Sequence, residues 1–150
     1  MFLWSFLAIL IIVSDQLTKY LAIKYISDKA FVTFIPKVID FAYVENNGAA
    51  FNILSGRIGL LSIISLLFVV GVIIYWVIKK PENKILKTAL MLLASGAAGN
   101  AIDRVFRGVV VDFIKTTFIE FPVFNIADIA ITCGAVLLII YLLFFDTKKE

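Results

Sequence analysis

The chain has 150 residues, and 62% of them are hydrophobic, which exceeds the share of about half that is usual in soluble domains. The length suits one domain, and the composition excludes an ordinary soluble fold in favour of an integral-membrane protein. The net charge is only +3 and there is no histidine, which excludes a dense basic patch for nucleic acid, Ser-His or Cys-His catalysis, and histidine-ligated metal sites.

Four stretches are apolar enough to cross a membrane, which takes about 20 residues. In chain order they predict transmembrane helices over approximately residues 2–26, 58–78, 85–104 and 126–145. The first lacks the basic start and small-residue cleavage site of a signal peptide, so we do not interpret it as one. Cys133, the only cysteine, lies in the fourth stretch, where we expect a small buried apolar residue.

The lysines predict how these helices are oriented. Four of them lie within residues 79–87, between the second and third helices, and Lys148 and Lys149 follow the fourth. Because positive charge gathers on the cytoplasmic side of a membrane, we expect these segments and both termini to be cytoplasmic. The remaining connections, approximately 27–56 and 107–124, should then lie on the outer side.

The two outer connections have the composition of strands rather than of flexible loops. The segments "AFVTFI" (30–35), "VIDFAYV" (38–44) and "GVVVDFI" (108–114) are rich in β-branched and aromatic residues. Long connections with structure of their own are usually functional. We therefore expect a small sheet that rests on the outer leaflet.

Five patches of polar side chains are spread along the predicted helices and outer connections. The predicted topology brings all five to the outer membrane interface. Helix residues three or four apart share a face, and the small residues of "SGAAG" (95–99) permit close helix contact. Carboxylates in membrane helices are costly and are therefore functional candidates. The polar patches are Asp15 with Lys19, "ENNGAAF" at 45–51, Asn100 with Asp103 and Arg104, Asp112, and Asn125 with Asp128.

Each patch taken alone also has a structural explanation. Asp15 and Lys19 can form an ion pair within one helix, and an aspartate in the first turn of a helix, such as Asp128, is favoured by the helix dipole. Asp112 is harder to explain in this way, because apolar residues surround it in the sequence. All the structural explanations would have to hold together, so we favour a functional site.

Acids, amides and arginine remain to supply the chemistry. Two close carboxylates share one proton, so that the ionised one can take a proton from water while the protonated one polarises a carbonyl. Asp112 and Asp128 are best placed for this, because both lie at the mouth of the helices. A small proton-coupled transporter that uses Asp15, Asp103 and Asp128 as a relay remains an alternative, as does a scaffold that associates through residues 95–99.

Five motifs closely resemble those of bacterial lipoprotein signal peptidase, also called signal peptidase II. Each motif alone is weak, but all five occur in the family's order, in a chain with four predicted spans and about this length. The motifs are "DQLTK" at 15–19, "NNGAAF" at 46–51, "GAAGNAIDR" at 96–104, "VVDF" at 110–113 and "FNIAD" at 124–128.

The resemblance implies an aspartic endopeptidase that removes signal peptides from diacylglyceryl-modified prolipoproteins, cleaving before the lipidated cysteine. It implies an all-α membrane fold, with four transmembrane helices and a small extracytoplasmic β-cradle, and no cofactor or metal. The expected partners are lipid-modified substrates and membrane lipids, without nucleic acid. We expect a monomer in the bacterial cell membrane with its active site at the outer face.

The resemblance also assigns roles to residues of this chain. It places the catalytic dyad on Asp112 and Asp128. It implies that the substrate is bound by Asn46, Asn100, Arg104 and Asn125. It implies supporting roles for Asp15, Lys19, Gly48 and Asp103. Two positions depart from the family pattern, because Ser95 stands where many relatives have glycine and Glu45 where a basic or hydroxyl residue is frequent.

Overall fold

The computed structural model describes residues 2–49 and 53–145. Over these ranges the chain forms four helices and three strands, and each helix begins and ends within two residues of its predicted limits. All four helices are long and apolar enough to cross a membrane. In chain order the elements are α1 (Phe2–Ile26), β1 (Val32–Ile35), β2 (Ile39–Asn46), α2 (Ile58–Lys79), α3 (Lys84–Phe106), β3 (Val110–Thr116) and α4 (Ile126–Phe144).

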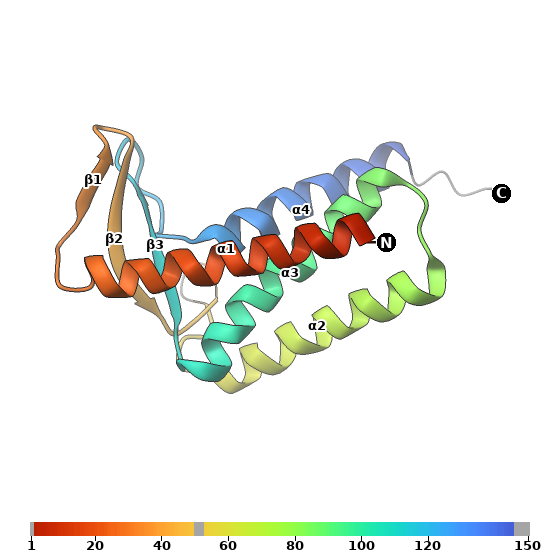
Figure 1. Ribbon diagram of the computed structural model, residues 1–150, viewed down its shortest axis with the longest axis horizontal. Helices are drawn as coiled ribbons and strands as arrows, with labels where there is room; N and C mark the ends of the chain where they lie inside the picture. Colours follow the sequence, from red (N-terminus) through yellow and green to blue (C-terminus); the bar gives the residue numbers. More distant parts are fainter. Residues whose placement is uncertain (1, 50–52, 146–150) are drawn as a thin grey trace.

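The helices lie side by side, and the sheet lies across one end of them (Figure 1). Helix α3 is central, because it packs against α1, α2 and α4. In its most apolar stretch 50% of the residues are buried, against 17% in each of the other helices. Large apolar side chains such as Leu67 and Ile78 of α2 are 66% and 68% exposed, as expected of a helix that faces lipid.

Small residues on α3 allow its neighbours to approach closely. Ser95 is buried, and a Cβ atom added to Gly96 would collide with the backbone oxygen of Ala127 in α4. A Cβ added to Gly99 would lie 2.7 Å from Oδ2 of Asp15 in α1. The predicted close contact through residues 95–99 is therefore confirmed.

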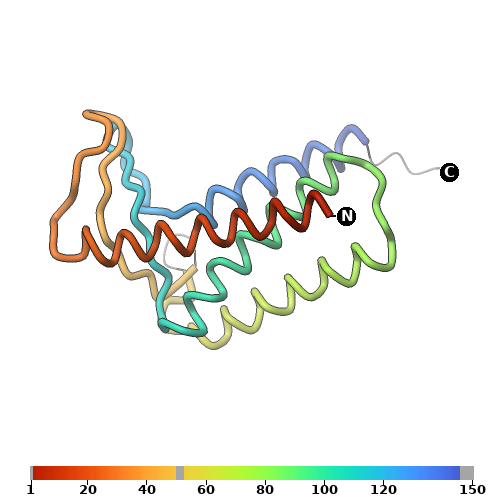
Figure 2. Tube along the Cα trace, in the orientation of Figure 1, coloured from red at the N-terminus to blue at the C-terminus, as the bar shows by residue number. Residues whose placement is uncertain are grey.

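The predicted sheet is present and has three antiparallel strands in the order β1-β2-β3. Ala22 of α1 and Val111 and Phe113 of β3 form a small buried core, against which Phe41 of β2 packs. This core fastens the sheet to one end of α1. The beginning of α1 and the connection between α2 and α3 lie at the other end of the molecule, away from the sheet (Figure 2).

Candidate active site

Strand β3 and the start of α4 are tied together by backbone hydrogen bonds. The N–H groups of Phe113 and Ile114 donate to the carbonyl oxygen of Phe124 at 3.0 and 2.8 Å, and the N–H of Phe124 donates to the oxygen of Ile114 at 3.1 Å. The chain therefore doubles back after β3. As a result Asp112 of the strand contacts Asn125, which directly precedes α4.

Helix α4 begins with a capping box formed by Asn125 and Asp128. The side-chain oxygen of Asn125 accepts a hydrogen bond from the N–H of Asp128 at 2.9 Å, and the Asp128 carboxylate accepts one from the N–H of Asn125 at 3.2 Å. These bonds satisfy N–H groups that the first turn of a helix leaves without partners. The capping box thereby fixes the Asp128 side chain to the backbone at the start of the helix.

Asp112 is only 2% exposed, and both of its carboxylate oxygens accept hydrogen bonds from amides. Nδ2 of Asn125 donates to Oδ1 at 2.6 Å, and Nδ2 of Asn46 donates to Oδ2 at 3.0 Å. Burial raises the pKa of Asp112 to about 6, with a contribution from the nearby charge of Asp128, while the two amide hydrogen bonds oppose the rise. A carboxyl with this pKa can hold or release a proton near neutral pH.

Asn100 and Asn125 connect the two aspartates in one network. Nδ2 of Asn100 donates to Oδ1 of the half-buried Asp128 at 2.8 Å, and Nδ2 of Asn125 lies 3.2 Å from Oδ1 of Asn100. Arg104, one turn further along α3, donates from Nη2 to the carbonyl oxygen of Gly48 at 3.0 Å. This bond joins α3 to the segment that follows β2.

A buried cluster of charges lies between α1 and α3 beside this network. The side chains of Asp15, Lys19 and Asp103 are 0% exposed. Nζ of Lys19 lies 2.8 Å from Asp15 Oδ2 and 2.9 Å from Asp103 Oδ2, and it donates to Oδ1 of Asn100 at 2.9 Å. Arg107 forms a further ion pair with Asp103. Two acids and two bases therefore balance one another within the cluster.

The acids of this cluster also hold the backbone near the candidate dyad. Oδ1 of Asp15 accepts a hydrogen bond from the N–H of Ala127 at 2.9 Å, at the start of α4. Oδ2 of Asp103 accepts one from the N–H of Val111 at 3.1 Å, directly before Asp112. Both acids thus have structural contacts that fit supporting roles.

Gln16 and Arg107 belong to the same cluster, although none of the motif assignments gave them a role. Nε2 of Gln16 donates to Asp103 Oδ1 at 3.0 Å and to the carbonyl oxygen of Gly99 at 3.1 Å. Its Oε1 accepts from Nη1 of Arg107 at 2.9 Å. Spacing could have revealed both, because Gln16 lies inside "DQLTK" and Arg107 follows Asp103 by four residues.

A cavity of about 530 Å³ opens beside the two aspartates, and both polar and apolar side chains line it. Cys133, which we expected to be buried, is exposed and forms part of the wall. The fourth helix is apolar all round, so its sequence does not reveal which face is covered. The polar side chains of the lining include Asn46, Asn100, Arg104, Asp112 and Asp128, and the apolar ones include Val110, Phe124, Ile129 and Ile131.

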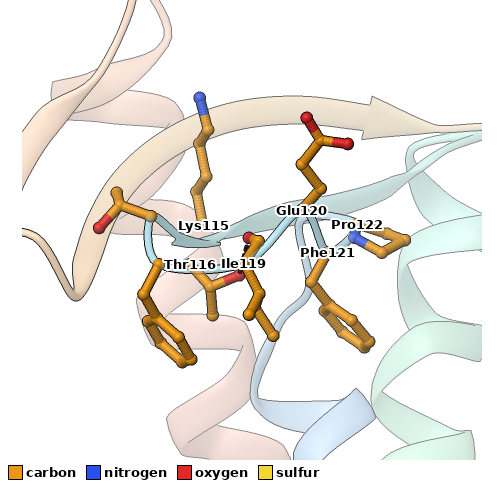
Figure 3. Close-up of a pocket in the computed structure, with 8 residues that line it drawn as sticks. Lys115, Thr116, Ile119, Glu120, Phe121 and Pro122 are labelled. Atoms are coloured by element: carbon orange, nitrogen blue, oxygen red, sulfur yellow. Dashed lines mark hydrogen bonds between the residues drawn. The ribbon is translucent and has the colours of Figure 1, made fainter.

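A second hollow, of about 660 Å³, is formed by residues 115–122, at the end of β3 and in the loop that follows it. In Figure 3 the side chains of Lys115 and Glu120 point to one side of this loop, whereas Ile119 and Phe121 point to the other, toward the helices. Its lining residues are not those that hold the aspartates. We therefore assign the chemistry to the first cavity.

The structure brings together the residues to which the sequence assigned roles in the site, whereas Ala50 and Phe51 of the patch at 45–51 lie outside the described residues. Five of them line the cavity, and Asn125 bridges the two aspartates. The residues predicted to support the site contact these residues or the adjacent backbone; they are Asp15, Lys19, Gly48 and Asp103. Their contacts are compatible with the predicted roles in catalysis, substrate binding and support, and these roles stay predictions.

Comparison with known proteins gives consistent matches over almost the whole chain. The model of a family described as Signal peptidase (SPase) II matches residues 7–144. A lipoprotein signal peptidase of Lactobacillus johnsonii is 41% identical, over 97% of this chain and 95% of its own length. One from Geobacillus thermodenitrificans is 39% identical, over 99% and 94%. A solved bacterial membrane enzyme is 36% identical with a TM-score of 0.89, covering 100% of this chain and 94% of that one.

Proposed function

This chain belongs to the signal peptidase II family, and from this premise we propose that it is an aspartic endopeptidase. It is a multi-pass membrane protease that removes signal peptides from prolipoproteins. We further propose that the prolipoprotein substrate carries a diacylglyceryl group and is cleaved before the lipidated cysteine. The observation that carries the aspartic mechanism is that Asp112 and Asp128 line one cavity and are joined through the same amide side chains.

In the proposed reaction, Asp112 and Asp128 share one proton and hold a water molecule. The ionised carboxylate takes a proton from the water as its oxygen attacks the scissile carbonyl carbon, while the protonated carboxyl donates a hydrogen bond to the carbonyl oxygen. Collapse of the tetrahedral intermediate breaks the C–N bond, and the carboxyl that took the proton from the water donates it to the leaving amine. The pKa of about 6 at Asp112 supports this scheme, because the carboxyl can retain a proton near neutrality.

We assign substrate binding to Asn46, Asn100, Arg104 and Asn125. A guanidinium has five N–H donors, so Arg104 can hold the carbonyl of Gly48 and a substrate carbonyl together. An amide that donates to a catalytic carboxylate can likewise present its oxygen to a peptide N–H. These residues would therefore align the peptide and orient the acids at once.

The apolar walls of the cavity favour a lipid-modified substrate. Burying a CH₂ group contributes about 0.8 kcal/mol, so acyl chains can supply much of the binding energy. The proposed substrate presents its scissile bond near the membrane surface while its acyl chains stay in the bilayer. We propose that membrane lipids and the prolipoprotein are the partners of a monomeric enzyme.

A proton-coupled transporter is not favoured. The relatives are signal peptidases over nearly the whole chain. The acids that would form its relay also lie close together. Asp15 and Asp103 both pair with Lys19, and Lys19 donates to Asn100, which in turn donates to Asp128. A relay across a membrane requires acids at both depths.

Substitution of the two aspartates tests the mechanism. Asp112→Asn and Asp128→Asn should each abolish cleavage of a diacylglyceryl-modified prolipoprotein, measured as a mobility shift with purified protein. Asparagine keeps the shape of aspartate but cannot take or give the proton. The double variant should be no less active than either single variant, because the two residues act as a unit.

Two controls accompany this experiment. Asp40→Asn replaces another buried carboxylate, in β2 but outside the cavity, and should keep full activity. An unlipidated peptide of the same sequence should be cleaved far more slowly than the lipidated one. Substantial cleavage by either Asp112→Asn or Asp128→Asn, in protein with a normal thermal melt, would rule out the dyad.

A further inference from the structure

Lys19 gives all three of its ammonium protons to buried acceptors. An ammonium group carries three donors and no acceptor. The partners of Nζ are Asp15 Oδ2 at 2.8 Å, Asp103 Oδ2 at 2.9 Å and Asn100 Oδ1 at 2.9 Å. The first two contacts balance charge. The third is made to a neutral amide, so charge balance alone does not explain it.

The third contact fixes the orientation of the Asn100 amide. Because an ammonium can only donate, the amide oxygen must face Lys19 and the amino group must face away from it. That amino group donates to Oδ1 of Asp128 at 2.8 Å. A reversed amide would set an oxygen against the carboxylate and an amino group against the ammonium, with the loss of both hydrogen bonds.

Asn125 holds the same oxygen less strongly than Lys19 does. Its Nδ2 lies 3.2 Å from Oδ1 of Asn100, but also 2.6 Å from Asp112 Oδ1 and 3.4 Å from the carbonyl oxygen of Val111. An amide nitrogen has two protons, so these three acceptors must share them. Lys19 is therefore the principal group that sets the Asn100 amide.

We propose that Lys19 is a positioning residue for the cleavage reaction, and that it acts through the Asn100 amide to hold the Asp128 carboxylate in place for the attacking water. This inference rests on the proposed function, because it takes Asp128 as a member of the dyad. Lys19 is not among the residues that line the cavity. Its influence therefore passes through Asn100 rather than through contact with the substrate.

The first test compares Lys19→Met with Arg107→Gln. Both variants remove a cation that pairs with Asp103, but only Lys19 contacts Asn100. Lys19→Met should lower kcat by about 10-fold to 100-fold, as expected for misplaced reacting groups. Its KM for the lipidated substrate should stay within about threefold of the wild-type value, because Lys19 does not line the cavity and the apolar walls proposed to hold the acyl chains are unchanged. Arg107→Gln should keep the wild-type kcat.

A double-mutant cycle separates positioning from general support of the fold. If Lys19 acts through Asn100, then adding Lys19→Met to an Asn100→Ala variant should lower kcat by less than about threefold. If Lys19 only stabilises the helices, its full effect should persist in the Asn100→Ala background. That persistence would overturn the proposal, as would a wild-type kcat in folded Lys19→Met.

Lys19→Met leaves Asp15 without its cation and can fail to fold, because an unpaired buried charge is costly. The variant Lys19→Met/Asp15→Asn removes one charge of each sign, and the amide oxygen that replaces the carboxylate can still accept from the N–H of Ala127. It should show the same loss of kcat, and a wild-type kcat would again refute the proposal.

The test of the dyad is independent of this one. An active Asp128→Asn variant would refute the proposed mechanism itself. An inactive Asp128→Asn variant together with a fully active Lys19→Met variant would refute only the positioning role of Lys19.

Discussion

Three asparagine amides hold the two candidate catalytic carboxylates, and each amide is oriented by a group that can only donate. The N–H of Gly48 fixes Asn46, the N–H of Asp128 fixes Asn125, and the ammonium of Lys19 fixes Asn100. The amino groups of all three must therefore face carboxylate oxygens. This arrangement sets the geometry of the acids before any substrate arrives, which is the requirement for efficient proton transfer.

The raised pKa of Asp112 predicts a pH-dependent cost to stability. An aspartate in an unfolded chain has a pKa of about 3.9, whereas the pKa of Asp112 in the folded protein is about 6. Between these values the folded state binds more protons than the unfolded state, so the contribution of Asp112 to the free energy of unfolding falls as the pH rises. Asp112→Asn cannot ionise and should lack this loss.

The measurement is the melting temperature in detergent of Asp112→Asn and of the wild type. The variant minus wild-type difference should be more positive at about pH 7.5 than at about pH 4.5. A difference for Asp112→Asn that is constant or decreases with pH would show that burial does not penalise this carboxylate.

At the level of single residues, the sequence predicted which side chains meet but not how they pair. Asp15 and Lys19 pair as expected from their spacing of four. The contacts of Lys19 with Asn100 and of Asp15 with the N–H of Ala127 join residues 81 and 112 positions apart. They depend on the rotation of each helix about its axis. An evenly apolar helix does not encode that rotation in its pattern, which is also why the exposure of Cys133 was not predicted.

At the scale of the elements, α3 is the helix against which the others are arranged. Gly96 and Gly99 let it pack closely against α4 and α1, and Asp15 of α1 reaches the backbone N–H of Ala127 in α4. The length and number of helices followed directly from apolar runs, and the strands from β-branched and aromatic residues. The return of the chain from β3 to Phe124 depends on long-range pairing that no local pattern specifies.

Gly96→Ala should destabilise the contact between α3 and α4. The new Cβ would collide with the carbonyl of Ala127 and would lie 2.8 Å from a side-chain carbon of Ile131. Overpacking of this kind costs about 1–3 kcal/mol, and the displacement would reach the start of α4 next to Asp128. We expect a lower melting temperature and a lower rate of cleavage.

Gly71→Ala is the matched control, because it makes the same change within α2 where a new Cβ would have nothing within 4 Å. Its melting temperature and activity should equal or exceed those of the wild type, since alanine is the better helix former. Equal melting temperatures for the two variants would indicate that α3 and α4 can separate at little cost.

At the scale of the whole molecule, the candidate site and the lysine-rich connection lie at opposite ends. The sheet, whose strand β3 carries Asp112, lies at one end of the helices, and the connection between α2 and α3 lies at the other (Figure 1). Because lysines gather on the cytoplasmic side, we propose that the site faces outward and that both termini are cytoplasmic. This orientation would let the enzyme meet a lipoprotein that is anchored in the outer leaflet.

Cysteine labelling in intact cells tests this orientation. In a Cys133→Ser background, Lys115→Cys should react with a membrane-impermeant maleimide added from outside, whereas Lys84→Cys should react only after lysis. Both lysines are exposed, in β3 and at the start of α3. Labelling of position 84 in intact cells would reverse the proposed topology.

The charge cluster also bears on how the chain enters the bilayer during synthesis. A lone charge at the centre of a membrane helix costs about 2.5–3.5 kcal/mol on insertion, but here each helix carries a neutralising partner four residues away. Asp15 pairs with Lys19 within α1, and Asp103 pairs with Arg107, the residue that follows α3. Neither buried aspartate would therefore enter the bilayer as an unpaired charge. Only when α1 and α3 associate does Lys19 gain Asp103 and Asn100, so the catalytic geometry would be completed by the association of the helices rather than carried by any helix alone.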